Sequence, residues 1–364
     1  MKSNDSDIVF HLCDHDFQKL MSNPQLYLPK RWDGKNFEEE LNSLFSIYLH
    51  ELISLREQAM NHTGISNDGY HEILGICSAV KDCVQTYHRG FPTQAYSILE
   101  STMEQLMHTP LDIYQKTGQL EELQEDSLFL YRVRKTSGGL KYSRKEIFHV
   151  PANHRSMVST CRYSIAGYPS LYLSTSLDLA AEEIGASANQ CIASRFKLNR
   201  SLSTLDLTVL ELGIKPQDFI SSEDNNRDRN QRLYSSSISL DSSHVRNAYL
   251  KWYPVIAACS FIRANRSTPF ASEYIVPQLL MQWIRINTHR NRLMGLRYFS
   301  CASMKASDAG FDYVFPTSNW DYEGNYCTVL RDAFQVTEPV YIKDYTNSRS
   351  CEKDLNYHLP LDKI

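Results

Sequence analysis

Apolar residues recur at steps of three and four along residues 36–118, the spacing expected of helices with one buried face. Three such runs, at 37–52, 73–87 and 95–107, predict three helices. The second run is followed by Gly90 and Pro92, which together are a typical helix stop. Because short connections favour antiparallel neighbours, the pattern predicts an all-α helical bundle over residues 36–120.

After residue 121 the pattern changes to short apolar or alternating segments separated by turns. We predict strands at 127–134, 170–174, 190–197, 203–207, 295–300, 313–315 and 339–343. We predict helices at 177–185, 242–260 and 274–286. The sequence therefore predicts an α+β domain over residues 121–346. A poorly patterned lead-in (1–35), a polar loop (221–241) and a loosely packed tail (347–364) complete the division.

Charge and hydropathy narrow the class of partner. The formal net charge of −4 gives no sign of the basic surface that a nucleic-acid partner usually requires. The first residues contain no long apolar run of the kind found in signal peptides, and the most apolar later run, 253–262, is too short to span a bilayer. We therefore expect a cytoplasmic protein with neither a membrane nor a nucleic acid as partner.

The cysteines and histidines offer little sign of a metal site. The nine cysteines are scattered and form no Cys-x-x-Cys pair, so free thiols are expected. His11, Cys13 and His15 would share one face of a strand. A structural zinc also needs a fourth ligand, which the sequence does not offer nearby. We expect no metal.

One segment carries candidate chemistry. Residues 162–183 are expected to form a loop with a turn at Gly167, a short strand that contains Tyr172, and then a helix. Ser174 or Ser176 can cap that helix. Glu183 falls one to two turns into the helix, so its carboxylate and the Tyr172 side chain can face a common cleft.

This segment resembles the RES domain, a family named for Arg, Glu and Ser. The residues that match the family's motif are Arg162, Gly167, Pro169, Tyr172, Ala180 and Glu183. Residues 273–280 resemble the family's Tyr-x-x-x-Gln helix, and 295–300 its Gly-Ile-x-Tyr-x-Ser strand, whose serine would be Ser300. The chain departs from the pattern at Ser164, where the family often has Asn, and in its extra helical domain. The resemblance covers roughly residues 128–344.

The resemblance implies a fold and an activity. It implies an ADP-ribosyltransferase-like split β-sheet core with flanking helices. RES proteins include toxins of bacterial toxin–antitoxin pairs that degrade NAD⁺ by hydrolysis or phosphorolysis. NAD⁺ would be the substrate, with no cofactor and no metal. An antitoxin or regulatory protein would be a partner, and we expect a homo-oligomer in which the helical domain serves assembly, autoinhibition or sensing.

The residue roles follow from the chemistry of that bond. Glu183 would stabilise the positive charge that develops on the ribose as nicotinamide leaves. Arg162, with Arg132 as second candidate, would hold the pyrophosphate. Tyr172 would offer a flat face to nicotinamide or a hydroxyl to the ribose, and Ser300 a hydrogen bond to the carboxamide or a phosphate.

Several alternatives stay open. Glu182 could replace Glu183, although we expect it to face solvent. Arg134 shares a strand face with Arg132 and could replace it. Cys301 and Ser303 follow Ser300 closely, which weakens the assignment of that serine. The acceptor could be water, phosphate or a macromolecule, so transfer of ADP-ribose to a protein or nucleic acid is the first alternative. A degenerate nucleotide-binding module is the second.

Overall fold

The computed structural model describes residues 14–58, 65–108, 129–136, 142–185, 191–198, 208–220, 243–291, 293–321, 323–342 and 358–360. The predicted loop at 221–241 lies outside these residues, as do most of the predicted tail and two members of the His-Cys-His cluster. The chain divides into two compact units. The helical unit comprises Met1–Ile113 and Lys215–Leu279, and the sheet unit comprises Tyr114–Ile214 and Leu280–Ile364.

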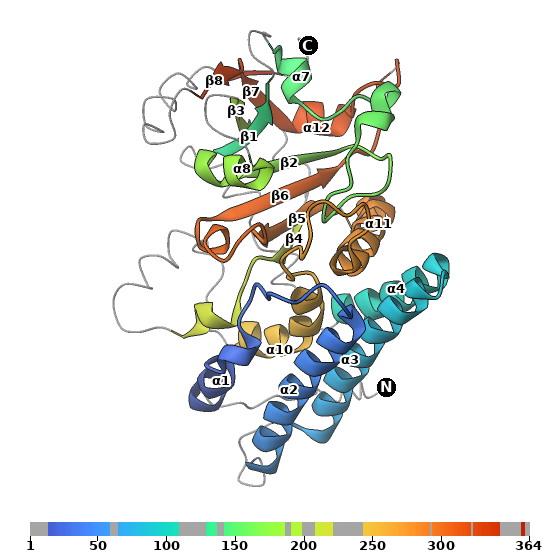
Figure 1. Ribbon diagram of the computed structural model, residues 1–364, viewed down its shortest axis with the longest axis vertical. Coiled ribbons are helices and arrows are strands. Elements are labelled where there is room, and N and C mark those ends of the chain that lie inside the picture. Colours follow the sequence, from blue (N-terminus) through green and yellow to red (C-terminus); the bar gives the residue numbers. More distant parts are fainter. Residues whose placement is uncertain are drawn as a thin grey trace, which may run out of the picture. The chain divides into compact units, whose positions relative to one another are not determined.

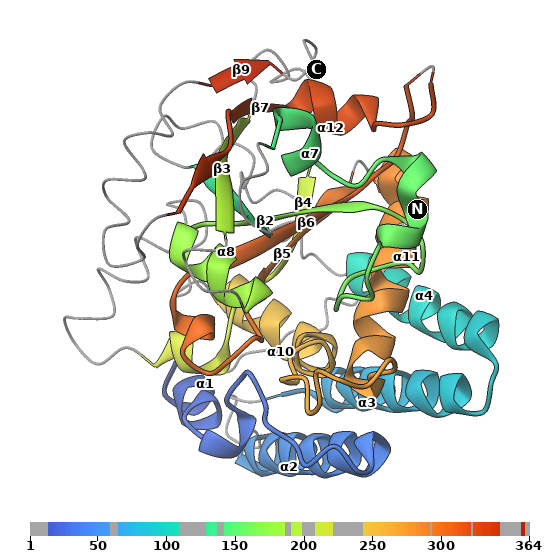
Figure 2. The same ribbon diagram turned by 45° about the horizontal axis from the view of Figure 1, so that its top comes forward.

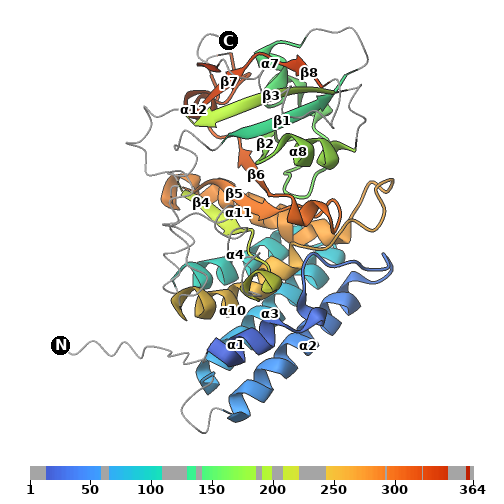
Figure 3. The same cartoon turned by 90° about the vertical axis from the view of Figure 1, so that its left-hand side faces the viewer.

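The helical unit contains the three helices that the apolar periodicity predicts. They are α2 (Phe37–Gln58), α3 (Asn67–His88) and α4 (Pro92–His108). Helix α3 packs against α2, α4 and α10 (Ser243–Ala258), as Figure 3 shows. The lead-in also forms a helix, α1 (Asp14–Met21), which the sequence pattern did not indicate.

The helical unit is discontinuous in sequence. Residues 215–279, which the sequence analysis placed in the second domain, pack within the helical unit. The Tyr48 hydroxyl donates to the Leu250 carbonyl at 2.7 Å, and the Tyr253 hydroxyl donates to the Leu26 carbonyl at 3.0 Å. Both hydroxyls are buried, so these bonds satisfy groups that would otherwise be costly to bury. The boundary predicted at residue 120 separated α10 from the helical bundle. No feature of the sequence joins them, because α10 has its own apolar periodicity and no boundary signal lies near it.

The sheet unit is built on one mixed sheet of nine strands (Figures 1 and 2). Eight of them follow the order β4-β5-β6-β2-β1-β3-β7-β9, and β8 also pairs with β3. Among the strands of the described ranges, only the β4–β5 pair is parallel. The strands are β1 (Leu130–Lys135), β2 (Ser170–Ser174), β3 (Cys191–Leu198), β4 (Thr208–Leu212), β5 (Leu293–Phe299), β6 (Phe311–Pro316), β7 (Phe334–Thr337), β8 (Val340–Tyr341) and β9 (His358–Pro360).

The helices of the sheet unit are mostly short. They are α7 (Arg144–Ile147), α8 (Leu177–Ile184), α11 (Ile275–Asn291), in which the division between the units falls, and α12 (Thr328–Ala333). The fold class is α+β with a mixed sheet and flanking helices, as predicted. Its likeness to ADP-ribosyltransferases stays a prediction.

The middle of the sheet is weakly joined. Strands β1 and β2 share a single register pair, Tyr131 with Ser174, whereas β1 pairs with β3 along its full length. The two halves of the sheet therefore meet mainly at this one position. Arg132 follows Tyr131 on β1, and Tyr172 lies two residues before Ser174 on β2. Two of the predicted site residues therefore lie close to this single pair.

Helix α8 closes over the same region. Ser176 caps its start by accepting a hydrogen bond from the Leu179 backbone, and Gly185 ends it in the left-handed conformation, with φ of 55°. Leu177 and Ala181 of α8 belong to one apolar cluster with Tyr131 of β1. This packing fixes α8 on the sheet and leaves the polar residues of α8 outside the apolar cluster.

A glycine allows β5 and β6 to approach each other closely. A Cβ added at Gly295 would overlap the carbonyl oxygen of Val314 and the ring of Phe315. Any larger residue at 295 would therefore push β5 away from β6. This accounts for the glycine that begins the 295–300 motif, four residues before the strand ends.

The predicted elements match the structure unevenly. The bounds of β2 and, within a residue or two, of β3, β5, β6 and α8 were predicted. Strands β4, β7 and β9 and helix α12 were not. The strand predicted at 203–207 lies outside the described residues, directly before β4.

Candidate active site

The loop before β2 is held by a serine. Ser164 Oγ accepts a hydrogen bond from the Cys161 backbone and donates one to the Cys161 carbonyl, both at 2.9 Å. Arg162 lies inside this turn, and its side chain is buried. Ser164, which stands where the RES family often has Asn, thus makes two local bonds that fix the turn. Because Arg162 lies inside this turn, these bonds also fix its position.

Tyr172 is tied back to the same loop. Its hydroxyl donates to the Tyr163 carbonyl at 2.6 Å. The ring of Tyr163 packs on that of Tyr298 from β5, with centroids 4.7 Å apart. The proton of the Tyr172 hydroxyl is therefore directed at the protein backbone. The predicted stacking role of the Tyr172 ring stays a prediction.

Glu183 and Ser300 are joined by a hydrogen bond. The Ser300 Oγ donates a hydrogen bond to Glu183 Oε1, and it also accepts one from the Ala302 backbone at 3.1 Å. Ser300 is fully buried directly after β5, and Glu183 is half-buried near the end of α8. The structure thus brings together two residues that the sequence analysis took from separate motif blocks.

An aspartate that the sequence analysis missed lies beside this pair. Asp312 of β6 is opposite Tyr298 of β5 and Ser174 of β2, and it is buried. Ser174 donates to Asp312 Oδ1. Burial, followed by the negative charge of Glu183 and a hydrogen bond with it, raises the pKa of Asp312 well above its ordinary value.

The geometry agrees with a protonated Asp312. Its Oδ2 is buried and has no hydrogen-bond partner in the described part of the chain, so no donor there stabilises a negative charge on this oxygen. Asp312 is then a neutral carboxylic acid beside the side chain of Glu183. The sequence does contain a signal for Asp312, because it is an acidic residue within an otherwise apolar strand.

Tyr298 completes the buried polar cluster. Burial, and then the charge of Asp312, raises the pKa of Tyr298 well above its ordinary value. The phenol is therefore neutral and can act as a donor. Tyr298 is the tyrosine of the 295–300 motif, in which the sequence predicts a role only for Ser300.

Arg132 is a half-buried cation, and its Nη1 atom is fully buried. No hydrogen-bond partner for its Nη1 exists among the described residues. Burial, and then the charge of Arg134, lowers the pKa of Arg132, whereas Cys161 and Tyr172 raise it. Since an uncompensated buried charge is costly, this guanidinium is suited to an anionic ligand.

Arg134 has a structural task. Its Nη2 donates to the Phe148 carbonyl at 2.7 Å and so ties β1 to the segment after α7. The choice between Arg132 and Arg134, which the sequence left open, therefore favours Arg132 for a ligand.

Glu182 does not simply face solvent, so that expectation is wrong. Its side chain is half-buried, and Ser303 Oγ donates to Oε1 at 2.5 Å. Glu182 and Glu183 thus each bind a serine of the segment after β5. Only Glu183 also interacts with Asp312.

Within the described ranges, His, Cys, Asp and Glu side chains form no cluster of three or more suited to a metal ion. None of the helices in those ranges combines the length and apolar character needed to cross a bilayer.

Comparisons with known proteins give one similarity. No family model and no solved structure matches the chain. A Bacillus subtilis protein named "Putative toxin YopC" is 24% identical over 344 residues, which cover 91% of this chain and 72% of that protein. The aligned region therefore includes both the helical unit and the sheet unit.

Proposed function

We propose that this chain is a toxin that cleaves the nicotinamide–ribose bond of NAD⁺. The observation that carries the proposal is the carboxylate of Glu183, oriented by Ser300 and set beside the acid Asp312. The name of the Bacillus subtilis protein supports a toxin role, and the RES-like motifs support the bond that is cleaved.

The proposed chemistry needs one negative charge at the ribose. As nicotinamide departs, positive charge develops on the ribose, and Glu183 stabilises it more than it stabilises the ground state. Ser300 holds the carboxylate in one orientation. Because Asp312 stays protonated, the pair carries a single charge, and Asp312 can donate its hydrogen bond to Glu183 without repelling it.

The half-buried arginine supplies the complementary charge. Arg132 would bind the pyrophosphate of NAD⁺, with Arg162 as the second cation. A bound dianion would provide the partner that Arg132 Nη1 lacks among the described residues. Tyr172, whose ionisable group interacts with Arg132, would then lie against the nicotinamide riboside portion.

The acceptor of ADP-ribose is open to direct test. The protein would be incubated with NAD⁺, with and without phosphate, and the products identified by mass. Free nicotinamide with ADP-ribose indicates hydrolysis, ADP-ribose-1″-phosphate indicates phosphorolysis, and a mass increase on a protein or nucleic acid indicates transfer. NAD⁺ that stays intact under all of these conditions, with the protein folded, would refute the proposal.

Partners also belong to the proposal. A toxin of this kind would be held inactive by an antitoxin or regulatory protein. The homo-oligomer and the cytoplasmic location expected from the sequence stay predictions.

A further inference from the structure

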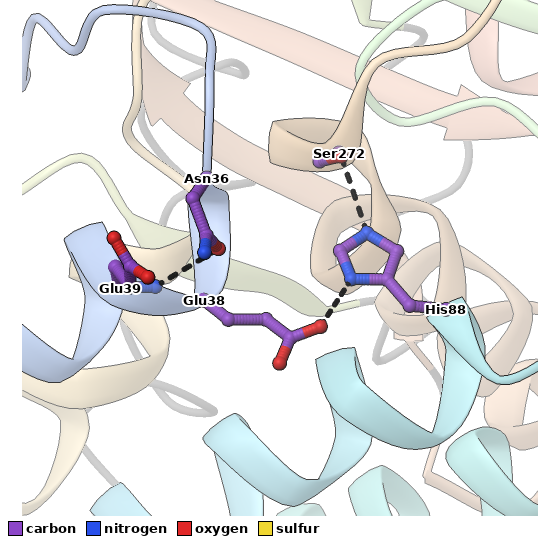
Figure 4. Close-up of polar contacts among 5 residues, drawn as sticks. All are labelled: Asn36, Glu38, Glu39, His88 and Ser272. Atoms are coloured by element: carbon purple, nitrogen blue, oxygen red, sulfur yellow. Dashed lines mark hydrogen bonds and ion pairs between the residues drawn. The ribbon is translucent and has the colours of Figure 1, made fainter.

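Three side chains of the helical unit form a hydrogen-bonded row apart from the site described above (Figure 4). Glu38 Oε1 lies 2.7 Å from His88 Nδ1, and His88 Nε2 lies 3.2 Å from Ser272 Oγ. The imidazole thus stands between a carboxylate and a hydroxyl. This is the order of groups that activates the nucleophile of serine hydrolases.

Each residue is positioned at the end of an element. Glu38 lies in the first turn of α2, His88 is the last residue of α3, and Ser272 begins the short helix η7 (Ser272–Tyr274). Asn36 holds the start of α2 by accepting a hydrogen bond from the Glu39 backbone at 3.3 Å. The three side chains therefore converge from segments far apart in sequence.

The contacts favour one tautomer of the imidazole. A carboxylate only accepts hydrogen bonds, so the Glu38 contact places a proton on His88 Nδ1. With Nδ1 protonated in neutral His88, Nε2 has a free electron pair for the proton of Ser272. The carboxylate would also stabilise the imidazolium formed when that proton moves.

The row is open to solvent and lies beside the exposed aromatic ring of Phe270. The side chains of His88 and Glu38 are 26% and 31% exposed. Phe270, two residues before Ser272, is 54% exposed, and its ring lies 6.3 Å from the imidazole and stacks on Tyr87. Exposed aromatic surface next to a nucleophile suits an apolar acyl group.

We propose that Ser272, His88 and Glu38 form a second, hydrolytic site that cleaves esters with an apolar acyl group. Ser272 Oγ bonds to the acyl carbon while its proton passes to His88 Nε2. The bond to the alcohol then breaks, and the alcohol leaves with that proton. Water attacks the acyl-serine and gives a proton to His88, which passes that proton to Ser272 Oγ as the acid is released.

A fluorophosphonate probe tests the nucleophile on the full chain. The expected result is one adduct, located by mass spectrometry on the peptide that contains Ser272. Ser272→Ala should give no adduct. Ser267→Ala is the matched control, since Ser267 is an exposed hydroxyl five residues away that donates to Asn265 rather than to a histidine, and it should react like wild type.

Hydrolysis of p-nitrophenyl esters tests the role of His88 and the preference for an apolar acyl group. His88→Gln should lower the rate about 100-fold or more, because it removes the base. Octanoate esters should react faster than acetate esters. Glu183→Gln should leave this rate unchanged, which separates this site from the proposed NAD⁺ site. A wild-type chain without an adduct on Ser272, or Ser272→Ala with the wild-type esterase rate, would overturn the proposal and leave these contacts as a structural tether.

Discussion

Ser300 donates a hydrogen bond to Glu183 across 117 positions of sequence. The bond joins the segment after β5 to α8 and restricts the carboxylate to one orientation. Asp312 interacts with the same carboxylate from β6. Two sequence blocks that were linked only by a family resemblance are thus adjacent, and the proposed chemistry depends on that adjacency.

Ser300→Ala should lower kcat for NAD⁺ cleavage about tenfold, because a hydrogen bond to a charged group contributes about 1.5 kcal/mol or more. The reason is a loss of orientation of Glu183, so KM should change little. Steady-state kinetics on NAD⁺ measures both constants. Ser303→Ala is the control, since Ser303 binds Glu182 instead. Equal losses in both variants would argue against a specific role for Ser300.

Arg132→Met should weaken NAD⁺ binding without lowering stability. The substitution removes a half-buried charge whose buried Nη1 has no hydrogen-bond partner in the described ranges, so the folded protein loses little in the absence of ligand. KM should rise about 10-fold to 100-fold if a charge-assisted bond to the pyrophosphate is lost.

Arg134→Met provides the contrast, because Arg134 binds the Phe148 carbonyl. That variant should lower the thermal midpoint and affect KM less. The reverse pattern, in which Arg132→Met destabilises the protein and leaves KM unchanged, is incompatible with a ligand role for Arg132.

Asp312→Asn should change how stability depends on pH. The folded-state pKa of Asp312 is raised, whereas the unfolded value is about 3.9. Above about pH 4 the unfolded chain has lost this proton and the folded chain keeps it, so rising pH favours unfolding until the folded pKa is passed. The wild type should therefore lose stability relative to Asp312→Asn by up to about 1.4 kcal/mol per pH unit in that window.

Urea unfolding of both proteins between pH 4 and 8 measures this difference. Parallel stability curves would show that Asp312 ionises normally in the folded chain.

Asp312→Ala should behave differently from Asp312→Asn in the NAD⁺ assay, since the amide can still donate a hydrogen bond to Glu183 and the methyl group cannot.

The sequence predicted those elements whose ends carry strong local signals. Strand β2 lies between the turn at Gly167 and the cap at Ser176, and both of its ends were predicted. Helix α8 ends at Gly185, where a left-handed residue is required. Strand β4 is followed directly by Gly213, but the prediction stopped immediately before the strand, at residue 207.

The site was predicted in part, and its gaps have a physical cause. Asp312 lies one residue outside the strand predicted at 313–315, and its burial depends on Ser174 of β2 and Glu183 of α8. The choice between Arg132 and Arg134 depends on the Phe148 carbonyl, whose position the sequence does not specify. Long-range partners of this kind require the tertiary structure.

The most direct test of the central claim is the rate of NAD⁺ loss in Glu183→Gln, measured beside wild type and Glu182→Gln. Glutamine keeps the size of the side chain and removes the charge that stabilises the ribose cation. Glu183→Gln should retain the fold by circular dichroism and lose about 100-fold or more in rate. Glu182→Gln should keep the wild-type rate. Wild-type NAD⁺ consumption by Glu183→Gln would contradict the account.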